Sequence, residues 1–106
     1  MREVKHIEEA DFEKAIQANK FVLVDFYATW CPPCKMLAPV LEETLNELEE
    51  DVDIVKINVD EAENLSRKFN IMSIPTLILF KDGVQVDKTI GFMPKEQLIA
   101  FIVANR

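Results

Sequence analysis

The chain has 106 residues, of which 49 % are hydrophobic and 29 % are charged, and its formal net charge at pH 7 is −7. This length is typical of one domain, so we expect a single domain over residues 1–106. The acidic balance argues against binding to nucleic acid or to anionic membranes, and no apolar run approaches the roughly 20 residues of a membrane-spanning helix. Because the N-terminal segment lacks an apolar signal sequence, we expect a cytoplasmic protein.

Strands and helices alternate along the chain. Apolar residues that recur every three or four positions indicate helices, and short apolar or alternating runs indicate strands. We expect Asp60 to cap one helix and Pro94 to be the first residue of another. The expected strands cover residues 4–7, 21–27, 52–59, 76–80 and 84–90, and the expected helices cover residues 8–19, 33–50, 60–69 and 94 onward. This order predicts an α/β sheet with helices on both faces and an antiparallel hairpin near the end.

The two cysteines of the chain, Cys31 and Cys34, are separated only by Pro32 and Pro33. A zinc site needs four ligands, and His6 is the only other thiol or imidazole ligand, so a metal site would need a second chain or carboxylates. A structural disulfide is disfavoured because loop-closure stabilisation grows with loop length and this loop is very short. The third explanation, a redox-active dithiol, accounts for more of the surrounding sequence.

The cysteine pair lies directly between a strand that is apolar on both faces and an amphipathic helix, a setting typical of redox-active Cys-x-x-Cys motifs. At a helix N-terminus, the dipole and the unpaired N–H groups favour a thiolate at Cys31, and the thiolate is the nucleophile. Cys34, one turn later, can attack a mixed disulfide. Pro32 and Pro33 stiffen this turn and donate no N–H, so we expect the amides of Cys34 and Lys35 to be the remaining donors to the thiolate.

Two charged residues interrupt the apolar strands on either side of this helix. Counting by twos places Asp25 on the same sheet face as Leu23 and Tyr27. A carboxylate in a central strand is costly unless it is paired, hydrogen-bonded or protonated, and Lys56 in the next strand is a candidate partner. Two explanations stay open. Either both residues lie in water at strand ends, or Asp25 is a buried acid with a raised pKa that moves protons for Cys34.

Several segments stand in a specific order and spacing: VDFYATWCPPCK, Pro39 in the following helix, KINVDE, SIPTLILFKDG, and Gly91 before the last helix. In this arrangement they resemble the thioredoxin family over essentially the whole chain. The resemblance implies the thioredoxin fold, an α/β fold in which four helices flank a central five-stranded mixed sheet of strand order 1-3-2-4-5.

The resemblance also implies roles for individual residues. Cys31 would be the exposed attacking thiolate, Cys34 the buried resolving thiol, and Asp25 the buried acid that acts on Cys34 through water, with Lys56 beside it. Pro75 would be a cis-proline that faces the sulfurs, although only about 5–6 % of X-Pro bonds are cis. The residues that would form a docking surface for substrates are Trp30, Pro32, Pro33, Val59, Ser73, Ile74, Gly91 and Phe92.

Within this docking surface, the resemblance gives Ile74 a role in binding, whereas Trp30 and Phe92 have an alternative explanation. Ile74 would offer backbone hydrogen bonds to an extended substrate segment. The alternative for Trp30 and Phe92 is ordinary packing in the core. The sequence also departs from the family pattern, since the family usually has glycine at Pro32 and tryptophan at Tyr27.

The function implied by the resemblance is reduction of disulfides in client proteins. Such a protein would bind no cofactor or metal, and a flavoprotein thioredoxin reductase would restore its dithiol with electrons from NADPH. We expect a monomer. An oxidase or isomerase of the same fold is a rival, but these usually carry histidine between the cysteines, whereas Pro32 and Pro33 bring no charge. A second rival is a binding module in which the cysteines are incidental.

Overall fold

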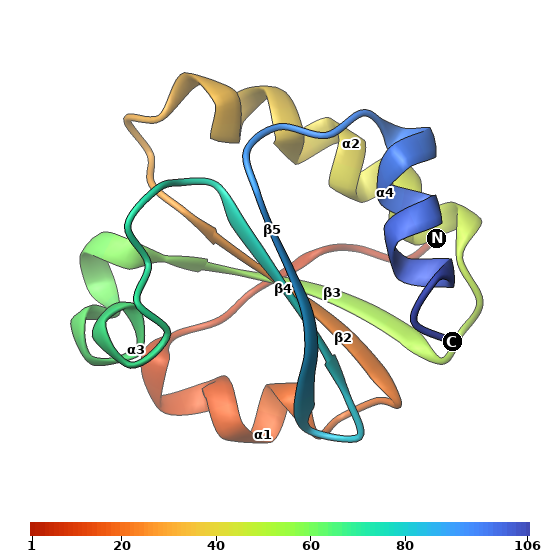
Figure 1. The fold of residues 1–106 in the computed structure, drawn as a ribbon, viewed down its shortest axis with the longest axis horizontal. Helices are drawn as coiled ribbons and strands as arrows, with labels where there is room; N and C mark the ends of the chain where they lie inside the picture. The colour runs from red at the N-terminus through yellow and green to blue at the C-terminus, as the bar shows by residue number, and fades with distance from the viewer.

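The computed structural model describes residues 1–106 as one five-stranded sheet with helices on both faces (Figure 1). The strands are β1 (Lys5–His6), β2 (Phe21–Tyr27), β3 (Val52–Asn58), β4 (Thr76–Lys81) and β5 (Val84–Ile90). The helices are α1 (Phe12–Ile16), α2 (Pro32–Glu47), α3 (Glu63–Lys68) and α4 (Lys95–Val103), with short 3-10 helices η1 (Glu9–Asp11) and η2 (Val59–Glu61) before α1 and α3. The strand order β1-β3-β2-β4-β5 confirms the predicted fold class.

Strand β2 lies in the middle of this sheet and all seven of its residues are buried. It pairs in parallel with β3 and antiparallel with β4. Because successive side chains point to opposite faces, β2 contributes to two cores. Val22, Val24 and Phe26 belong to the core that contains residues of α1 and α3, and Phe21 and Leu23 belong to the core that contains residues of α2 and α4. The prediction of a strand buried on both faces is confirmed.

Two predicted helix starts are wrong. Asp60 does not cap α3, because it lies within η2, before that helix. Its backbone amide donates a hydrogen bond to the Asn58 side chain at 2.9 Å. The residue that precedes α3 is Ala62, which makes no side-chain cap. Pro94 is the N-cap of α4 rather than its first residue, since its ψ of 160° is extended.

The other helix bounds are close to the predictions. Residues 8–19 divide into η1 and α1, because Glu8 and Asp11 form a capping box around a single 3-10 turn. The long helix α2 begins at Pro32, one residue earlier than predicted, and ends at Glu47. Two prolines in its first turn are compatible with a helix because the N–H groups there have no intrahelical partner.

The hairpin between β4 and β5 turns through Asp82 and Gly83, which have φ values of +52° and +80°. Positive φ at both central residues is the geometry of a type I′ turn, and an Asp-Gly pair suits it. A Cβ at Gly83 would also lie 3.2 Å from the Gln17 side chain. The turn joins β4 and β5 as an antiparallel pair, so the predicted hairpin near the end of the chain is confirmed.

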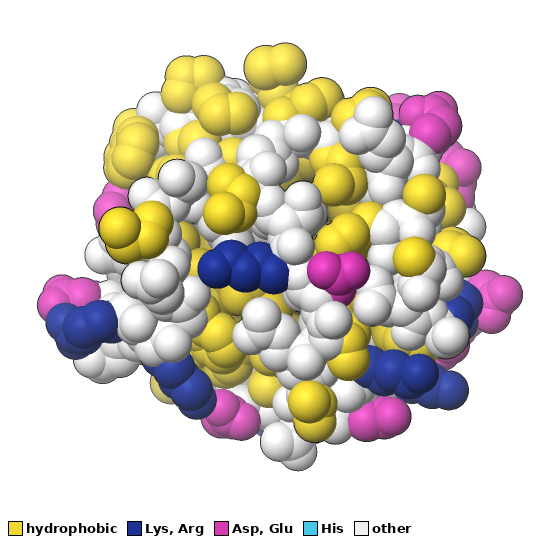
Figure 2. Space-filling view, viewed as in Figure 1, with side chains coloured by type: hydrophobic (Ala, Val, Ile, Leu, Met, Phe, Trp, Pro, Cys, Tyr) yellow, Lys and Arg dark blue, Asp and Glu magenta, His cyan; other side chains and the backbone are white.

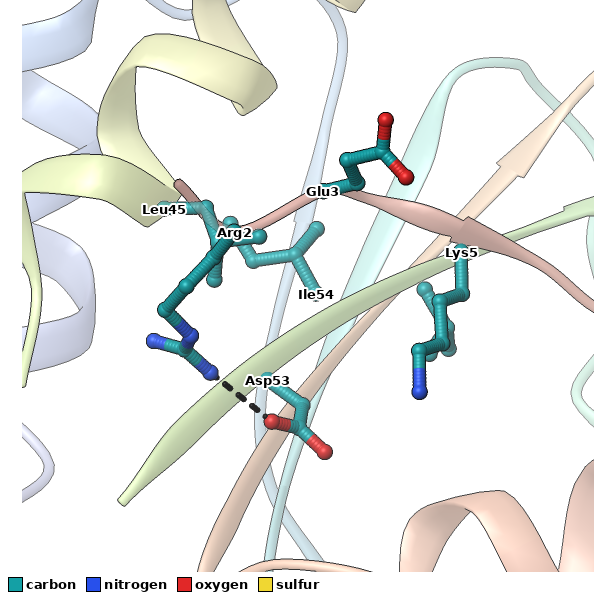
Figure 3. A pocket seen from close by; sticks show the side chains of 7 residues that line it. Arg2, Glu3, Lys5, Leu45, Asp53 and Ile54 are labelled. Atoms are coloured by element: carbon teal, nitrogen blue, oxygen red, sulfur yellow. Dashed lines mark hydrogen bonds and ion pairs between the residues drawn. The ribbon is translucent and has the colours of Figure 1, made fainter. Parts of the chain in front are cut away.

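The N-terminal segment is fixed to the start of β3 by Arg2 (Figure 3). Its guanidinium donates to the carboxylate of Asp53 at 2.9 Å, to the carbonyl of Glu49 at 3.2 Å and to the carbonyl of Val52. Asn19 donates to the same Asp53 carboxylate at 3.0 Å. Arg2 and Asp53 also line a small cavity of about 220 Å³ beside the N-terminal segment. One side chain thus joins the first residues of the chain to the turn that starts β3.

We predict that Arg2→Ala lowers the free energy of unfolding by about 1–3 kcal/mol, because hydrogen bonds that involve a charged group contribute about this much when partly buried. The measurement is urea unfolding of the oxidised protein. Arg67→Ala is the matched control, since Arg67 forms an exposed i,i+4 pair with Glu63 and such pairs contribute about 0.3–0.5 kcal/mol. Equal losses in the two variants would contradict the role given to Arg2.

Candidate active site

The two cysteines lie at the junction between β2 and α2 and form a disulfide with each other. Cys31 is the N-cap of α2, and Pro32 and Pro33 are its first two residues. The Cys34 amide donates to the Cys31 sulfur at 3.2 Å, which confirms one predicted donor. The prediction for Lys35 is wrong, because its amide donates to the carbonyl oxygen of Cys31 at 3.1 Å as an ordinary first helical hydrogen bond.

Both cysteines are buried in this disulfide form, with exposed fractions of 3 % for Cys31 and 4 % for Cys34. The expectation that Cys31 is exposed is therefore wrong for the oxidised state. The reason is packing: the two cysteines form a small cluster with Tyr27 and Ala28, and Ile74 packs against it. The Cys31 sulfur lies 3.8 Å from the carbonyl oxygen of Ile74.

Asp25 lies in the middle of β2, is 1 % exposed, and neither of its carboxylate oxygens has a hydrogen-bond partner. It shares the α2-facing side of the strand with Leu23 and Tyr27, as predicted. Burial raises the pKa of Asp25 from 3.8 to about 7, because the charged carboxylate loses its hydration, and the positive charge of Lys56 opposes this shift. The explanation that places Asp25 in water at a strand end is wrong.

Lys56 is the direct neighbour of Asp25 in the register between β2 and β3. It is half-buried and forms no ion pair with Asp25 within 4.0 Å. Its ammonium nitrogen lies 4.3 Å from the centre of the Tyr27 ring instead, within the range of a cation–π contact. The Tyr27 hydroxyl forms a hydrogen bond with the ring of His6 in β1. Tyr27 thus connects the lysine to the edge of the sheet.

The segment before β4 approaches the dithiol from the other side of β2. The Ile74–Pro75 peptide bond is cis, which confirms that expectation. The Pro75 carbonyl accepts a hydrogen bond from the Gly91 amide at 2.8 Å, so the two loops are joined. Gly91 has a φ of +97°, a backbone conformation that favours glycine. The Ile74 amide makes no hydrogen bond within the chain.

Exposed apolar side chains surround this end of the sheet. Trp30 is 64 % exposed and Phe92 is 42 % exposed, so the alternative of ordinary core packing is wrong for both. Ser73 and Pro32 are exposed, and Val59, Ile74, Pro33 and Gly91 are half-buried. Figure 2 shows hydrophobic side chains gathered over the upper left of the molecule, where Figure 1 places the start of α2.

One positioning contact was missed at the sequence level. The indole N–H of Trp30 donates to the Asp60 carboxylate at 2.8 Å, across 30 residues of sequence. Asp60 is in turn held by its backbone hydrogen bond to the Asn58 side chain. A local pattern suggests only a helix cap at Asp60, and nothing in the sequence pairs it with Trp30.

Two further features concern ligands and membranes. No three His, Cys, Asp or Glu side chains are grouped so as to hold a metal ion. None of the helices is both long and apolar enough to cross a membrane.

The comparisons with known proteins agree with this geometry. The thioredoxin family model matches residues 3–104. The chain is 53 % identical to the thioredoxin of Staphylococcus aureus strain COL over 92 residues, which covers 87 % of this chain and 88 % of that protein. A mutant thioredoxin from Halobacterium salinarum NRC-1 superposes with a TM-score of 0.87 at 38 % identity, covering 96 % of this chain and 89 % of that one. The chain belongs to the thioredoxin family and is a thiol-disulfide oxidoreductase with a redox-active dithiol at Cys31 and Cys34.

Proposed function

We propose that Cys31 is the nucleophile and Cys34 the resolving thiol in the reduction of client-protein disulfides. The observation that carries this assignment is the hydrogen bond from the Cys34 amide to the Cys31 sulfur at the N-terminus of α2. A sulfur that accepts an amide N–H at a helix N-terminus is stabilised as the thiolate. The Cys34 sulfur accepts no such hydrogen bond.

The reaction transfers two electrons to the client. The Cys31 thiolate attacks one sulfur of the client disulfide, a mixed disulfide forms, and the first client thiolate leaves. The Cys34 thiol then loses its proton, and its sulfur attacks the Cys31 sulfur. The Cys31–Cys34 disulfide closes, and the second client thiolate leaves. The client disulfide is reduced to two thiols, and the dithiol is oxidised.

We assign the removal of the Cys34 proton to Asp25, acting through water. Asp25 lies on the β2 face that is covered by α2, the helix that carries Cys34. Its pKa of about 7 is suited to accept and return a proton near neutral pH. Lys56 acts beside it, because its positive charge favours the ionised carboxylate.

We place the client on the side of the dithiol where Ile74 and cis-Pro75 lie. The free Ile74 amide and its carbonyl, 3.8 Å from the Cys31 sulfur, are suited to pair with an extended segment as an added strand would. The surface around them would provide apolar contacts. Its residues are Trp30, Pro32, Pro33, Val59, Ser73, Ile74, Gly91 and Phe92.

The remaining parts of the proposal concern the protein as a whole. Residues 1–106 act as one domain, because they share one five-stranded sheet, and the protein acts as a monomer. No bound cofactor takes part, and a flavoprotein thioredoxin reductase restores the dithiol with electrons from NADPH. A reducing dithiol of this kind fits the cytoplasm, where thiols are kept reduced.

We predict that Cys31→Ser abolishes turnover when insulin is reduced in the presence of dithiothreitol, because no sulfur remains to attack the client. Cys34→Ser is expected to trap a covalent mixed disulfide with the client, visible in non-reducing mass analysis, because the resolving thiol is absent. Unchanged turnover in Cys31→Ser would contradict the assignment of the nucleophile. Biological activity that survives serine at both positions would favour the binding module.

We predict that Asp25→Asn stabilises the protein at high pH and not at low pH. The folded-state pKa of about 7 lies above the ordinary value of 3.8, so the contribution of the protonated acid is intact below pH 3.8 and is lost as the pH rises through 7. A shift of this size corresponds to roughly 4 kcal/mol at 1.36 kcal/mol per pKa unit. Urea unfolding of the oxidised protein across this pH range measures the difference.

The control for this variant is Asp82→Asn, which removes a carboxylate from an exposed turn. It makes the same carboxylate-to-amide change at a site in water and leaves the buried acid Asp25 in place. If Asp25→Asn is no more stable than the wild type above pH 7, Asp25 is ionised in the folded protein at no cost and cannot have the raised pKa.

We predict that the dithiol is a reductant, with a potential nearer to about −270 mV than to about −120 mV, the value of a strong oxidant. Pro32 and Pro33 bring no positive charge that would stabilise the thiolate beyond the helix N-terminus. Redox titration against glutathione gives the potential, and a value close to that of the strong oxidant would favour an oxidase or isomerase.

A further inference from the structure

Three side chains form a row across the sheet, on the face that α2 covers. In the register of the strands, His6 of β1 is the neighbour of Lys56 in β3, and Lys56 is the neighbour of Asp25 in β2. Neighbours in register point to the same face of a sheet. Tyr27 follows Asp25 by two positions in β2, so it also lies on this face. The Lys56 ammonium group therefore has two candidate partners, the carboxylate of Asp25 and the ring of Tyr27.

The ammonium group contacts the ring and leaves the carboxylate without a partner. Its nitrogen lies 4.3 Å from the centre of the Tyr27 ring. No ion pair within 4.0 Å joins Lys56 to any acid, and neither oxygen of Asp25 has a hydrogen-bond partner. A buried carboxylate without a partner is unfavourable, and buried charges are ordinarily paired. The ring thus holds a cation that the carboxylate would otherwise be expected to bind.

The Tyr27 ring is itself held at both of its ends. Its hydroxyl forms a hydrogen bond with the imidazole of His6, and the centres of the two rings are 5.2 Å apart. Tyr27 also packs with Cys31 and Cys34 in the small buried cluster. The hydroxyl is therefore anchored at the edge strand β1, while the ring is fixed beside the dithiol. A phenylalanine at this position would keep the aromatic face but lose the anchor.

The charges that the other elements bring to this row do not offer Lys56 a better partner. On the β4 side, the register neighbour of Asp25 is the apolar Leu77. Lys35 of α2 lines the same hollow of about 280 Å³ as Lys56, and no acidic side chain lines it. Glu61 of η2 forms no ion pair with Lys56, although its charge acts on the tyrosine ring. The ammonium group is thus shared among the ring, the carboxylate and the water of the hollow.

We propose that Tyr27, anchored by His6, is a positioning residue that keeps the Lys56 ammonium group out of an ion pair with Asp25. The proposal rests on the proton transfer assigned above to Asp25. An opposite charge in direct contact lowers the pKa of a carboxyl group by about one to three units. A carboxylate with so low a pKa is a weak base for the Cys34 proton. Contact with the ring lets Lys56 act on Asp25 from a distance, so the carboxyl group still takes up and releases a proton near neutral pH.

The experiment measures the pKa of Asp25 in the oxidised protein, by ¹³C NMR of its side-chain carboxyl carbon across pH. The disulfide form is used because neither cysteine titrates in it. Tyr27→Leu removes the ring, Tyr27→Phe keeps the ring without its bond to His6, and His6→Ala removes the same bond from the other side. Each variant is also made together with Lys56→Met. The matched control combines Tyr27→Leu with Lys35→Met, which removes the other lysine of the hollow.

We expect Tyr27→Leu to lower the pKa of Asp25 by about one unit or more, the size of an ion-pair effect. Tyr27→Phe and His6→Ala should each produce a smaller fall, and the two falls should be equal, because both variants lose the same hydrogen bond. Every fall should vanish together with Lys56→Met, since no ammonium group is then left to pair with Asp25. The fall should persist together with Lys35→Met.

A pKa of Asp25 that is unchanged or raised in Tyr27→Leu would overturn the proposal. A fall that persists with Lys56→Met would also overturn it, because the ring would then act only by excluding water. If Tyr27→Leu does not fold, Tyr27→Phe and His6→Ala decide by the same comparison with and without Lys56.

The pH profile of insulin reduction separates this proposal from the proposed function. A profile that shifts together with the pKa of Asp25 in the Tyr27 variants supports both. A shifted pKa with an unmoved profile supports the positioning of Lys56 by Tyr27, and it contradicts the proton transfer assigned to Asp25.

Discussion

The burial of β2 between β3 and β4 is the constraint that positions the rest of the site. Because all seven of its residues are buried, the strand has one register with each neighbour, and a shift by one residue would exchange its two faces. This register sets Asp25 beside Lys56 on one side and beside Leu77 on the other. It also fixes where the chain leaves the sheet and turns into α2 at Cys31.

The same burial produces both the chemistry and an energetic cost. Asp25 has no hydrogen-bond partner, and the nearest cation in register, Lys56, lies over the Tyr27 ring rather than in an ion pair. The carboxyl group therefore titrates near neutral pH, where proton transfer to and from a thiol is useful, at the expense of folding stability.

The dithiol lies between two surfaces of different character. Exposed apolar side chains and the Ile74 backbone lie on one side, and a hollow lined by Lys35 and Lys56 lies on the other.

Most of the fold follows from local patterns. The alternation of buried strands and amphipathic helices, the antiparallel hairpin near the end and the position of the cysteine pair were all predicted and are confirmed. The errors lie at helix ends. Asp60 and Pro94 have side chains that suit a helix start, but each lies outside its helix, because the path of the chain into the next element decides where the first helical hydrogen bond forms.

The sequence by itself determined the kind of chemistry, because the features behind it are local: two cysteines three positions apart, at the start of a helix, after a strand apolar on both faces. Only the tertiary structure decided how far each group is exposed and which partner it has. Burial of Cys31 in the disulfide, the bond from Trp30 to Asp60, and the contact of Tyr27 with His6 and Lys56 join residues from different elements. Such contacts depend on strand order and side-chain reach, which local periodicity does not encode.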